Sequence, residues 1–183
     1  MVVVVISGMP GCGSSTAARL LAKKMRLKFF SAGDYTKKIA KEEEKIDKKL
    51  TERIVHFWNT HRGKSKEHHM SVEETQQNIA KKGNMVIESK LGIHFIENSD
   101  FKIWLKAPFK TRAERYVNRD KISIDDATKF LRDKENHERE NWKRIYGFDY
   151  FGQEKEADLV IDTSDKSPEE IVNIIIKFIG NKQ

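Results

Sequence analysis

The sequence predicts an α/β fold in which a parallel β-sheet is flanked by helices. Short apolar runs alternate with longer amphipathic stretches, as expected when strands and helices alternate along the chain. A glycine-rich turn joins the first apolar run to the first amphipathic stretch. The chain has 183 residues, of which 38% are hydrophobic, enough for one buried core and too few for two ordinary domains. We therefore expect a single domain over residues 1–183.

Five short runs rich in β-branched or aromatic residues are predicted to be strands. They are residues 2–6, 28–30, 84–87, 101–105 and 158–161. The amphipathic stretches predict helices over residues 15–25, 34–62 with a break, 72–82, 110–119, 124–145 and 168–179.

Polar residues mark the ends of several of these helices. Ser123 and Ser167 are each followed by acidic residues in the next turn, so both are expected to be N-caps. The most polar stretch, residues 61–70 (HRGKSKEHHM), is expected to be an exposed loop.

Charge and cysteine content limit the classes of partner and compartment. Lys and Arg outnumber Asp and Glu by 35 to 28, and the net charge of +7 suits nucleotide phosphates or nucleic acid. Cys12 is the one cysteine, so no internal disulfide can form. The start MVVVVISG lacks the features of a signal peptide, and no apolar run approaches the roughly 18 residues of a membrane span. We expect a cytoplasmic protein without a membrane partner.

The turn after the first predicted strand has the composition of a phosphate-binding loop. Its glycines allow the backbone to fold tightly, so that amide groups and the next helix N-terminus surround a phosphate. The residues expected to take part are Gly8, Met9, Pro10, Gly11, Cys12, Gly13, Ser14, Ser15 and Thr16. Ser15 stands where a P-loop places the hydroxyl that ligates Mg²⁺. A tight strand-to-helix connection without a ligand is the alternative.

One residue departs from the P-loop pattern G-x-x-x-x-G-K-[ST]. Ser14 stands in place of the lysine that contacts the β- and γ-phosphates. Losing one preorganised charge stabiliser costs roughly 2.7–4 kcal/mol of transition-state energy. Efficient catalysis therefore requires another cation.

Six segments in the same order resemble the archaeal-type cytidylate kinases. They are SAGD at residues 31–34 with the following KKIAKE, AKKGNMVIESKL at 80–91, KIWLKAP at 102–108, RAERYVNRDKIS at 112–123, YGFD at 146–149 and DLVIDTSDKSPEEI at 158–171. The resemblance implies a P-loop nucleoside kinase fold with a five-stranded parallel sheet, a monophosphate-binding helical insertion over about residues 34–82, and a lid with its following helix over about 112–150. It also implies transfer of the γ-phosphoryl group of ATP to CMP or dCMP with Mg²⁺. We expect a monomer that binds small nucleotides.

Basic residues after the fourth predicted strand are candidates for catalysis. Arg112, Arg115 and Arg119 recur at helical spacing, which predicts that they share one face over the phosphates. A solvated basic helix face is the alternative. Arg139, on the next predicted helix, and Lys90 complete the set of candidate catalytic cations.

Two carboxylates and two lysines are candidates for the acceptor site. Asp34 and Glu88 follow predicted strands, where α/β proteins bind ligands, and are expected to orient substrate or hold Mg²⁺ through water. A helix N-cap is the alternative for Asp34. Lys37 and Lys90 fall where the resemblance implies arginines that grip the acceptor phosphate, and ordinary surface lysines are the alternative.

Some alternatives remain open at the level of sequence. The chain is an active monophosphate kinase, a nucleotide-binding regulator that has lost catalysis, or a nucleic-acid-associated protein on the same scaffold. Cys12 is expected to be a small filler residue, with a reactive thiol of lowered pKa as the alternative. Phe57, Trp58 and Trp142 are expected to anchor the core, with stacking on a base as the alternative.

Overall fold

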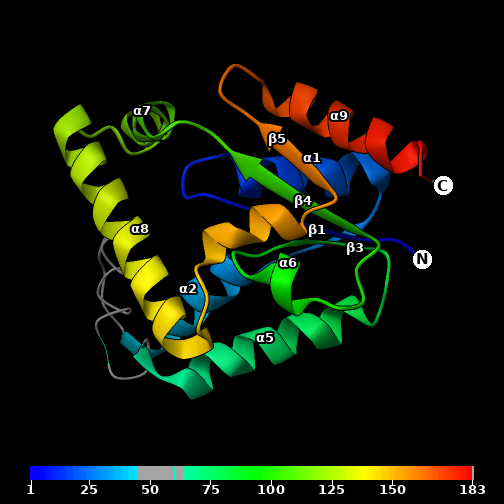
Figure 1. Ribbon diagram of the computed structural model, residues 1–183, viewed down its shortest axis with the longest axis horizontal. Helices are drawn as coiled ribbons and strands as arrows, with labels where there is room; N and C mark the ends of the chain where they lie inside the picture. The colour runs from blue at the N-terminus through cyan, green and yellow to red at the C-terminus, as the bar shows by residue number, and fades with distance from the viewer. Residues whose placement is uncertain (45–59, 61–63, 183) are drawn as a thin grey trace.

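Five parallel strands form one sheet in the order β2-β3-β1-β4-β5 (Figure 1). The computed structural model describes residues 1–44, 60 and 64–182. The strands are β1 Val3–Gly8, β2 Lys28–Ser31, β3 Met85–Glu88, β4 Phe101–Lys106 and β5 Leu159–Asp162. Each matches one predicted strand to within two residues at either end, so the sheet is confirmed.

Helices connect the strands and surround the sheet. They are α1 Ser14–Met25, α2 Ala32–Glu44, α5 Lys66–Ala80, α6 Gly92–Phe95, α7 Phe109–Asp120, α8 Ile124–Tyr146, the 3₁₀ helix η1 Tyr150–Glu156 and α9 Pro168–Gly180. In the part of the chain that the structure describes, no helix combines the length and the apolar character needed to cross a membrane.

The central strand β1 is buried along its whole length because helices cover both faces of the sheet. Its side chains alternate between two layers of core. Val4 and Ile6 pack on the side of α1 and α9, and Val3 and Val5 pack on the side of α6 and η1. The apolar run that predicted a strand is therefore a run buried on both faces.

The strand order predicts a ligand crevice at the carboxyl ends of β1 and β3. Ser31 of β2, Glu88 of β3 and Ile6 of β1 are register partners, so these strands end at the same edge. The chain leaves β1 toward β2 on one side and leaves β3 toward β4 on the other side. Such diverging connections open a crevice in which α/β proteins bind ligands.

A helical pair, α7 and α8, extends from this edge of the sheet. Ala113 and Tyr116 of α7 pack against Ala127 and Leu131 of α8. Figure 1 shows α8 running from α7 to the start of α5. There the Arg144 guanidinium donates to the Lys64 carbonyl at 2.9 Å. The segment expected to form a lid thus also contacts the segment expected to bind the monophosphate.

Both expected serine caps are confirmed. The Ser123 hydroxyl accepts from the Asp126 amide at the start of α8. At the start of α9, Ser167 forms a capping box with Glu170. Each cap satisfies amide groups that have no partner within the helix.

Some predictions about helices were wrong. Residues 64–70 are not an exposed loop, because α5 begins at Lys66. His68, in the first turn of this helix, is buried. The Ser65 hydroxyl caps this helix by accepting from the His68 amide. This N-cap was not predicted, because the residues around Ser65 are mostly charged. Helices α6 and η1 were not predicted, since both are too short to show an amphipathic period. The predicted break within residues 34–62 and residues 61–63 of the predicted loop lie outside the described residues.

Adjacent leucines on α1 provide a test of the two-layer core. Leu21 is 0% exposed between α1 and the sheet, whereas Leu20 is only partly buried beside the same core. Leu21→Ala is expected to lower the free energy of unfolding by about 2–5 kcal/mol because it leaves a cavity. Leu20→Ala is expected to cost less. Urea unfolding followed by circular dichroism measures both, and equal losses would contradict this packing.

Candidate functional site

The predicted phosphate-binding loop, or phosphate loop, runs from Gly8 to Gly13 and wraps tightly between β1 and α1. A side chain at Gly8 would place its Cβ 2.4 Å from the Leu105 carbonyl oxygen, so the loop needs glycine there to lie against β4. Gly11 has a φ of 79°, and a Cβ on it would meet the Tyr116 ring at 3.0 Å. Both glycines are therefore required by the structure, one for close approach and the other for its backbone conformation as well.

Helix α1 begins without a side-chain cap. Its N-cap, Gly13, adopts a left-handed conformation and offers no side chain to the first-turn amides. By contrast, α8 and α9 begin at serines whose hydroxyls accept from such amides. An N-terminus without a side-chain cap, at the end of a glycine-rich loop, carries partial positive charge, which suits a phosphate.

Glu88 collects hydroxyl groups from the ends of neighbouring segments. It is 7% exposed at the end of β3. One carboxylate oxygen accepts from Ser14 and Ser15 at 3.1 Å each, and the other accepts from Ser31 at 2.6 Å. The carboxylate predicted from its position after a strand thus lies directly against the start of α1. Ser14 stands at the position of the P-loop lysine, and its hydroxyl donates to this carboxylate.

Lys90 reaches the phosphate loop from the segment after β3. Its ammonium group donates to the Gly8 carbonyl oxygen at 2.6 Å. Lys90 is half-buried, so its ammonium group lies against the loop rather than extending into solvent. The loop that lacks the P-loop lysine therefore has a lysine from another segment beside it.

Asp34 and Lys37 lie together on the first turns of α2. The Asp34 carboxylate accepts from the Lys37 ammonium at 3.0 Å and forms an ion pair with Arg19 of α1. The Asp34 amide donates to the Ser31 hydroxyl at 3.2 Å, and that hydroxyl in turn donates to Glu88. Asp34 is connected to Glu88 through Ser31, while its own carboxylate engages two cations.

Arg112 fastens α7 to the back of the phosphate loop. It is 4% exposed, and its guanidinium donates to the Pro10 carbonyl at 3.0 Å and the Ala107 carbonyl at 2.9 Å. It also pairs with Glu135 of α8, which balances its buried charge. The alternative of a solvated basic face is wrong for Arg112, which is buried.

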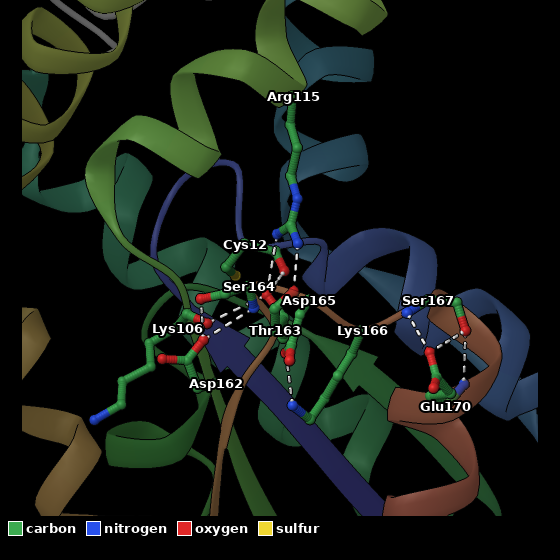
Figure 2. A network of polar contacts seen from close by, with 10 residues as sticks. All are labelled: Cys12, Lys106, Arg115, Asp162, Thr163, Ser164, Asp165, Lys166, Ser167 and Glu170. Atoms are coloured by element: carbon green, nitrogen blue, oxygen red, sulfur yellow. Dashed lines mark hydrogen bonds and ion pairs between the residues drawn. The ribbon is translucent and has the colours of Figure 1, made fainter.

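Arg115 joins the phosphate loop to the end of β5. Figure 2 shows its side chain extending from α7 to Thr163, with Cys12 of the loop beside them. The guanidinium donates to the Thr163 hydroxyl at 3.0 Å and to the Gly11 carbonyl at 3.3 Å, and it also donates to the Thr163 carbonyl. The Thr163 hydroxyl lies 2.9 Å from the Cys12 carbonyl. Thr163, which is fully buried, was not predicted as a site residue because no local pattern marks it.

Two other predicted arginines point elsewhere. Arg119 makes a bidentate contact with Asp120, with both distances 2.7 Å, and stacks over the Tyr116 ring. Arg139 pairs with Asp149 and stacks over the Phe151 ring. Both of these arginines pair with carboxylates, whereas Arg112 and Arg115 contact carbonyl groups of the phosphate loop.

A further charged group lies buried on α8. Glu138, 4% exposed, accepts from the Lys134 ammonium and from the Tyr150 hydroxyl at 3.0 Å each. Burial alone would raise the pKa of Glu138, but Lys134 and Lys90 hold it below the ordinary value. Sequence reasoning missed this group, although Ala127, Leu131 and Glu138 share one helix face by their spacing.

The structure decides two of the open alternatives. Burial raises the pKa of the Cys12 thiol, so the alternative of a thiol with lowered pKa is wrong. The Trp142 ring lies 4.7 Å from the Tyr150 ring, centroid to centroid, in the core beside α6 and η1. Core packing is thus confirmed for Trp142, whereas Phe57 and Trp58 lie outside the described residues.

Residues 3–165 match the model of the cytidylate kinase-like family. The chain is 33% identical over 183 residues to a cytidylate kinase of Methanocaldococcus jannaschii, and the match covers 98% of each chain. It is 34% identical over 180 residues to a cytidylate kinase of Ignicoccus hospitalis, covering 98% of this chain and 99% of the relative.

Solved structures share the fold at low sequence identity. An uncharacterized protein from Eubacterium ventriosum superposes with a TM-score of 0.67 at 13% identity, covering 98% of this chain and 99% of the other. A shikimate kinase from Acinetobacter baumannii, solved with shikimate, gives a TM-score of 0.63 at 15% identity, covering 100% of this chain and 95% of the other. At such identities the likeness extends to the fold alone.

The buried pair between α7 and α8 allows a stability test. Arg112→Met is expected to lower the free energy of unfolding by about 3–5 kcal/mol, because it leaves the Glu135 carboxylate without its partner. The double variant Arg112→Met/Glu135→Leu is expected to regain most of that loss. Arg119→Met removes an exposed pair and serves as the control, with a change of about 1 kcal/mol or less. Chemical denaturation measures all three. A double variant no more stable than Arg112→Met would contradict the stabilising role of the Arg112–Glu135 pair.

Proposed function

Because the chain belongs to the cytidylate kinase-like family, we propose that it transfers the γ-phosphoryl group of ATP to CMP or dCMP, giving ADP and CDP or dCDP. The observation that carries this proposal is the Lys90 ammonium group held on the glycine-rich loop, 2.6 Å from the Gly8 carbonyl oxygen. It supplies a positive charge at the loop that lacks the P-loop lysine. In this proposal the chain is one kinase domain that works as a monomer in the cytoplasm.

Phosphoryl transfer needs little covalent chemistry from the protein, so its residues act by positioning and by electrostatics. The loop from Gly8 to Gly13 and the uncapped N-terminus of α1 bind the phosphates of ATP. Ser14 and Thr16 line the start of the helix with hydroxyl groups. This arrangement fixes the donor against the carboxyl end of β1.

The oxygen groups at the start of α1 suit Mg²⁺. The Ser15 hydroxyl and the Glu88 carboxylate lie 3.1 Å apart, and such hard oxygen donors are the ligands that Mg²⁺ prefers. The ion, when bound, neutralises charge on the β- and γ-phosphates. We assign Ser15 as a direct ligand and Glu88 as a ligand through water. Asp34 is the second water-mediated carboxylate, and its amide donates to the Ser31 hydroxyl, which in turn donates to Glu88.

The acceptor phosphate is bound by lysines rather than arginines. Lys37 lies one turn along α2 from Asp34, whose amide donates to the Ser31 hydroxyl that contacts Glu88, and Lys90 lies at the loop. Each brings charge without the bidentate fork of an arginine. Asp34, which pairs with Lys37, orients that ammonium group for the acceptor.

Two of the arginines support the phosphate loop, and the other two belong to the lid. Arg112 and Arg115 hold the phosphate loop through its carbonyl groups, so they act on the reaction by fixing the loop and adding positive potential. Arg119 and Arg139 are the lid cations, which pair with Asp120 and Asp149 in this structure. When the lid closes, they exchange these partners for the transferred phosphoryl group. Lids of this type exclude water from the reacting phosphates.

A catalytically inactive regulator is the second candidate. The observation that favours it is Ser14, which turns toward Glu88 instead of supplying the P-loop lysine. Such a regulator would bind ATP and Mg²⁺ and release no ADP.

An assay of ADP release separates these two functions. With ATP, Mg²⁺ and each of CMP, dCMP, UMP, AMP and GMP in turn, CMP and dCMP are expected to be the best acceptors. A coupled enzyme system that oxidises NADH as ADP forms measures the rates. Background release with every acceptor, together with ATP binding by calorimetry, would favour the regulator.

Replacing Lys90 tests whether it compensates for the missing lysine. Lys90→Ala is expected to lower kcat by about a hundredfold to a thousandfold, as for other preorganised charge stabilisers. Lys102→Ala is the matched control, because Lys102 lies near the amino end of β4, at the opposite edge of the sheet. Ser14→Lys is expected to turn over CMP no faster than the unaltered protein. If Ser14→Lys turned over CMP faster than the unaltered protein and Lys90→Ala left kcat unchanged, Lys90 would not be the substitute for the missing lysine.

A further inference from the structure

A buried glutamine on α5 carries an acceptor without a donor. Gln76 is 0% exposed, between the buried residues Val72 and Ala80 on one face of the helix. Its amide nitrogen donates to the Glu73 carboxyl group at 2.8 Å and lies 3.3 Å from the Val72 carbonyl oxygen. Its amide oxygen is buried and has no hydrogen-bond partner in the described part of the chain.

The orientation of this amide is determined by its neighbours. The Val72 carbonyl can only accept, so the nitrogen must face it and the oxygen must face away. Rotating the amide by half a turn would bring two acceptors together at Val72. Buried polar atoms are almost always paired, and the exceptions in a folded protein need an explanation. A donor from a ligand would satisfy this oxygen.

Other polar groups lie close to Gln76. Burial raises the pKa of Glu73 to about 8, so its carboxyl group is largely protonated near neutral pH and offers a hydroxyl donor. The Tyr146 hydroxyl at the end of α8 is also buried and has no partner among the described residues. Burial raises the pKa of Tyr146, so its hydroxyl also keeps its proton near neutral pH.

Helix α5, which carries Gln76 and Glu73, packs on the acceptor side of the site. Helix α5 contacts α2, which bears Asp34 and Lys37, and β3, which ends at Glu88. A monophosphate held by its phosphate at Lys37 and Lys90 would extend its base toward the elements around these residues. Gln76 and Glu73 belong to that side.

We propose that the Gln76 amide oxygen and the neighbouring Glu73 carboxyl group read the base of the acceptor nucleotide. The oxygen accepts from an exocyclic amino group, and the carboxyl group donates to the adjacent ring nitrogen. The inference rests on the proposed function for the identity of the acceptor as a nucleoside monophosphate.

The donor and acceptor pattern selects among bases. Cytosine presents an amino group at position 4 beside an acceptor nitrogen, which complements this pair. Uracil presents an oxygen at position 4 and a donor at the ring nitrogen, so it would meet like groups at both atoms. Adenine carries the same amino and ring-nitrogen pattern as cytosine on a larger ring. We assign cytosine as the occupant, in accord with the proposed acceptor.

The test compares Gln76→Met with the matched control Gln77→Met. Methionine keeps the length of glutamine and removes the acceptor. Gln77 is the next residue on α5, and its amide donates instead to the Phe95 carbonyl. Gln76→Met is expected to lower the preference for CMP over UMP, as a ratio of kcat/KM, by about tenfold to a hundredfold. Gln77→Met is expected to leave that ratio unchanged, and thermal unfolding of both variants monitors their stability.

A ligand analogue gives the same information without relying on the folding of a variant. A CMP analogue with hydrogen in place of the 4-amino group is expected to bind the unaltered protein more weakly than CMP by a similar factor. Gln76→Met is expected to bind CMP and this analogue equally, because the interaction is already lost. Calorimetric titration measures these affinities.

The outcomes separate this inference from the proposed function. An unchanged CMP-to-UMP ratio in Gln76→Met, or equal binding of CMP and the analogue by the unaltered protein, would overturn the inference and leave the kinase function standing. No turnover with any acceptor would overturn the kinase function, while binding of CMP over the analogue that is lost in Gln76→Met would still support base reading. AMP as the best acceptor, with a loss in Gln76→Met, would overturn cytosine as the occupant.

Discussion

The site depends on one buried carboxylate that must be satisfied. Glu88 ends β3 and accepts hydroxyl hydrogen bonds from Ser14, Ser15 and Ser31. A buried carboxylate is costly unless it is hydrogen-bonded or paired, so these contacts hold the segments after β1 and β2 at fixed positions beside β3. The same carboxylate lies where an ion bound at Ser15 would need an oxygen ligand. One residue thereby joins the stability of the crevice to its proposed chemistry.

The phosphate loop is held from behind by a second set of contacts, made by cations. Arg112 and Arg115 donate to carbonyl groups of Pro10 and Gly11, while Lys90 donates to Gly8. Donors that engage the carbonyl groups on one side of a loop leave its amide groups available for an anion on the other. The acidic partner Glu135, on α8, balances the most buried of these cations, Arg112. The position of α8 and the shape of the loop are therefore linked.

Local sequence patterns predicted most of the framework and only part of the site. The five strands and the caps at Ser123 and Ser167 followed from contiguous residues, and so did the glycine loop. The start of α5 and the short helices α6 and η1 did not, because a few residues do not show a helical period and their stability comes from packing. Among the candidate cations, spacing placed Arg112, Arg115 and Arg119 on one helix face but could not tell which of them reach the loop.

By itself, the sequence determined the order of strands and helices, the phosphate loop with its missing lysine, and the candidate carboxylate Glu88. These depend on backbone conformation and on apolar periodicity, which nearby residues set. The tertiary structure alone decided which side chains meet: Ser14 with Glu88 across 74 positions, Arg115 with Thr163 across 48, and the Gln76 oxygen with no partner among the described residues. Such partners come from segments far apart in the chain, and only the packing of helices on the sheet brings them within hydrogen-bond distance.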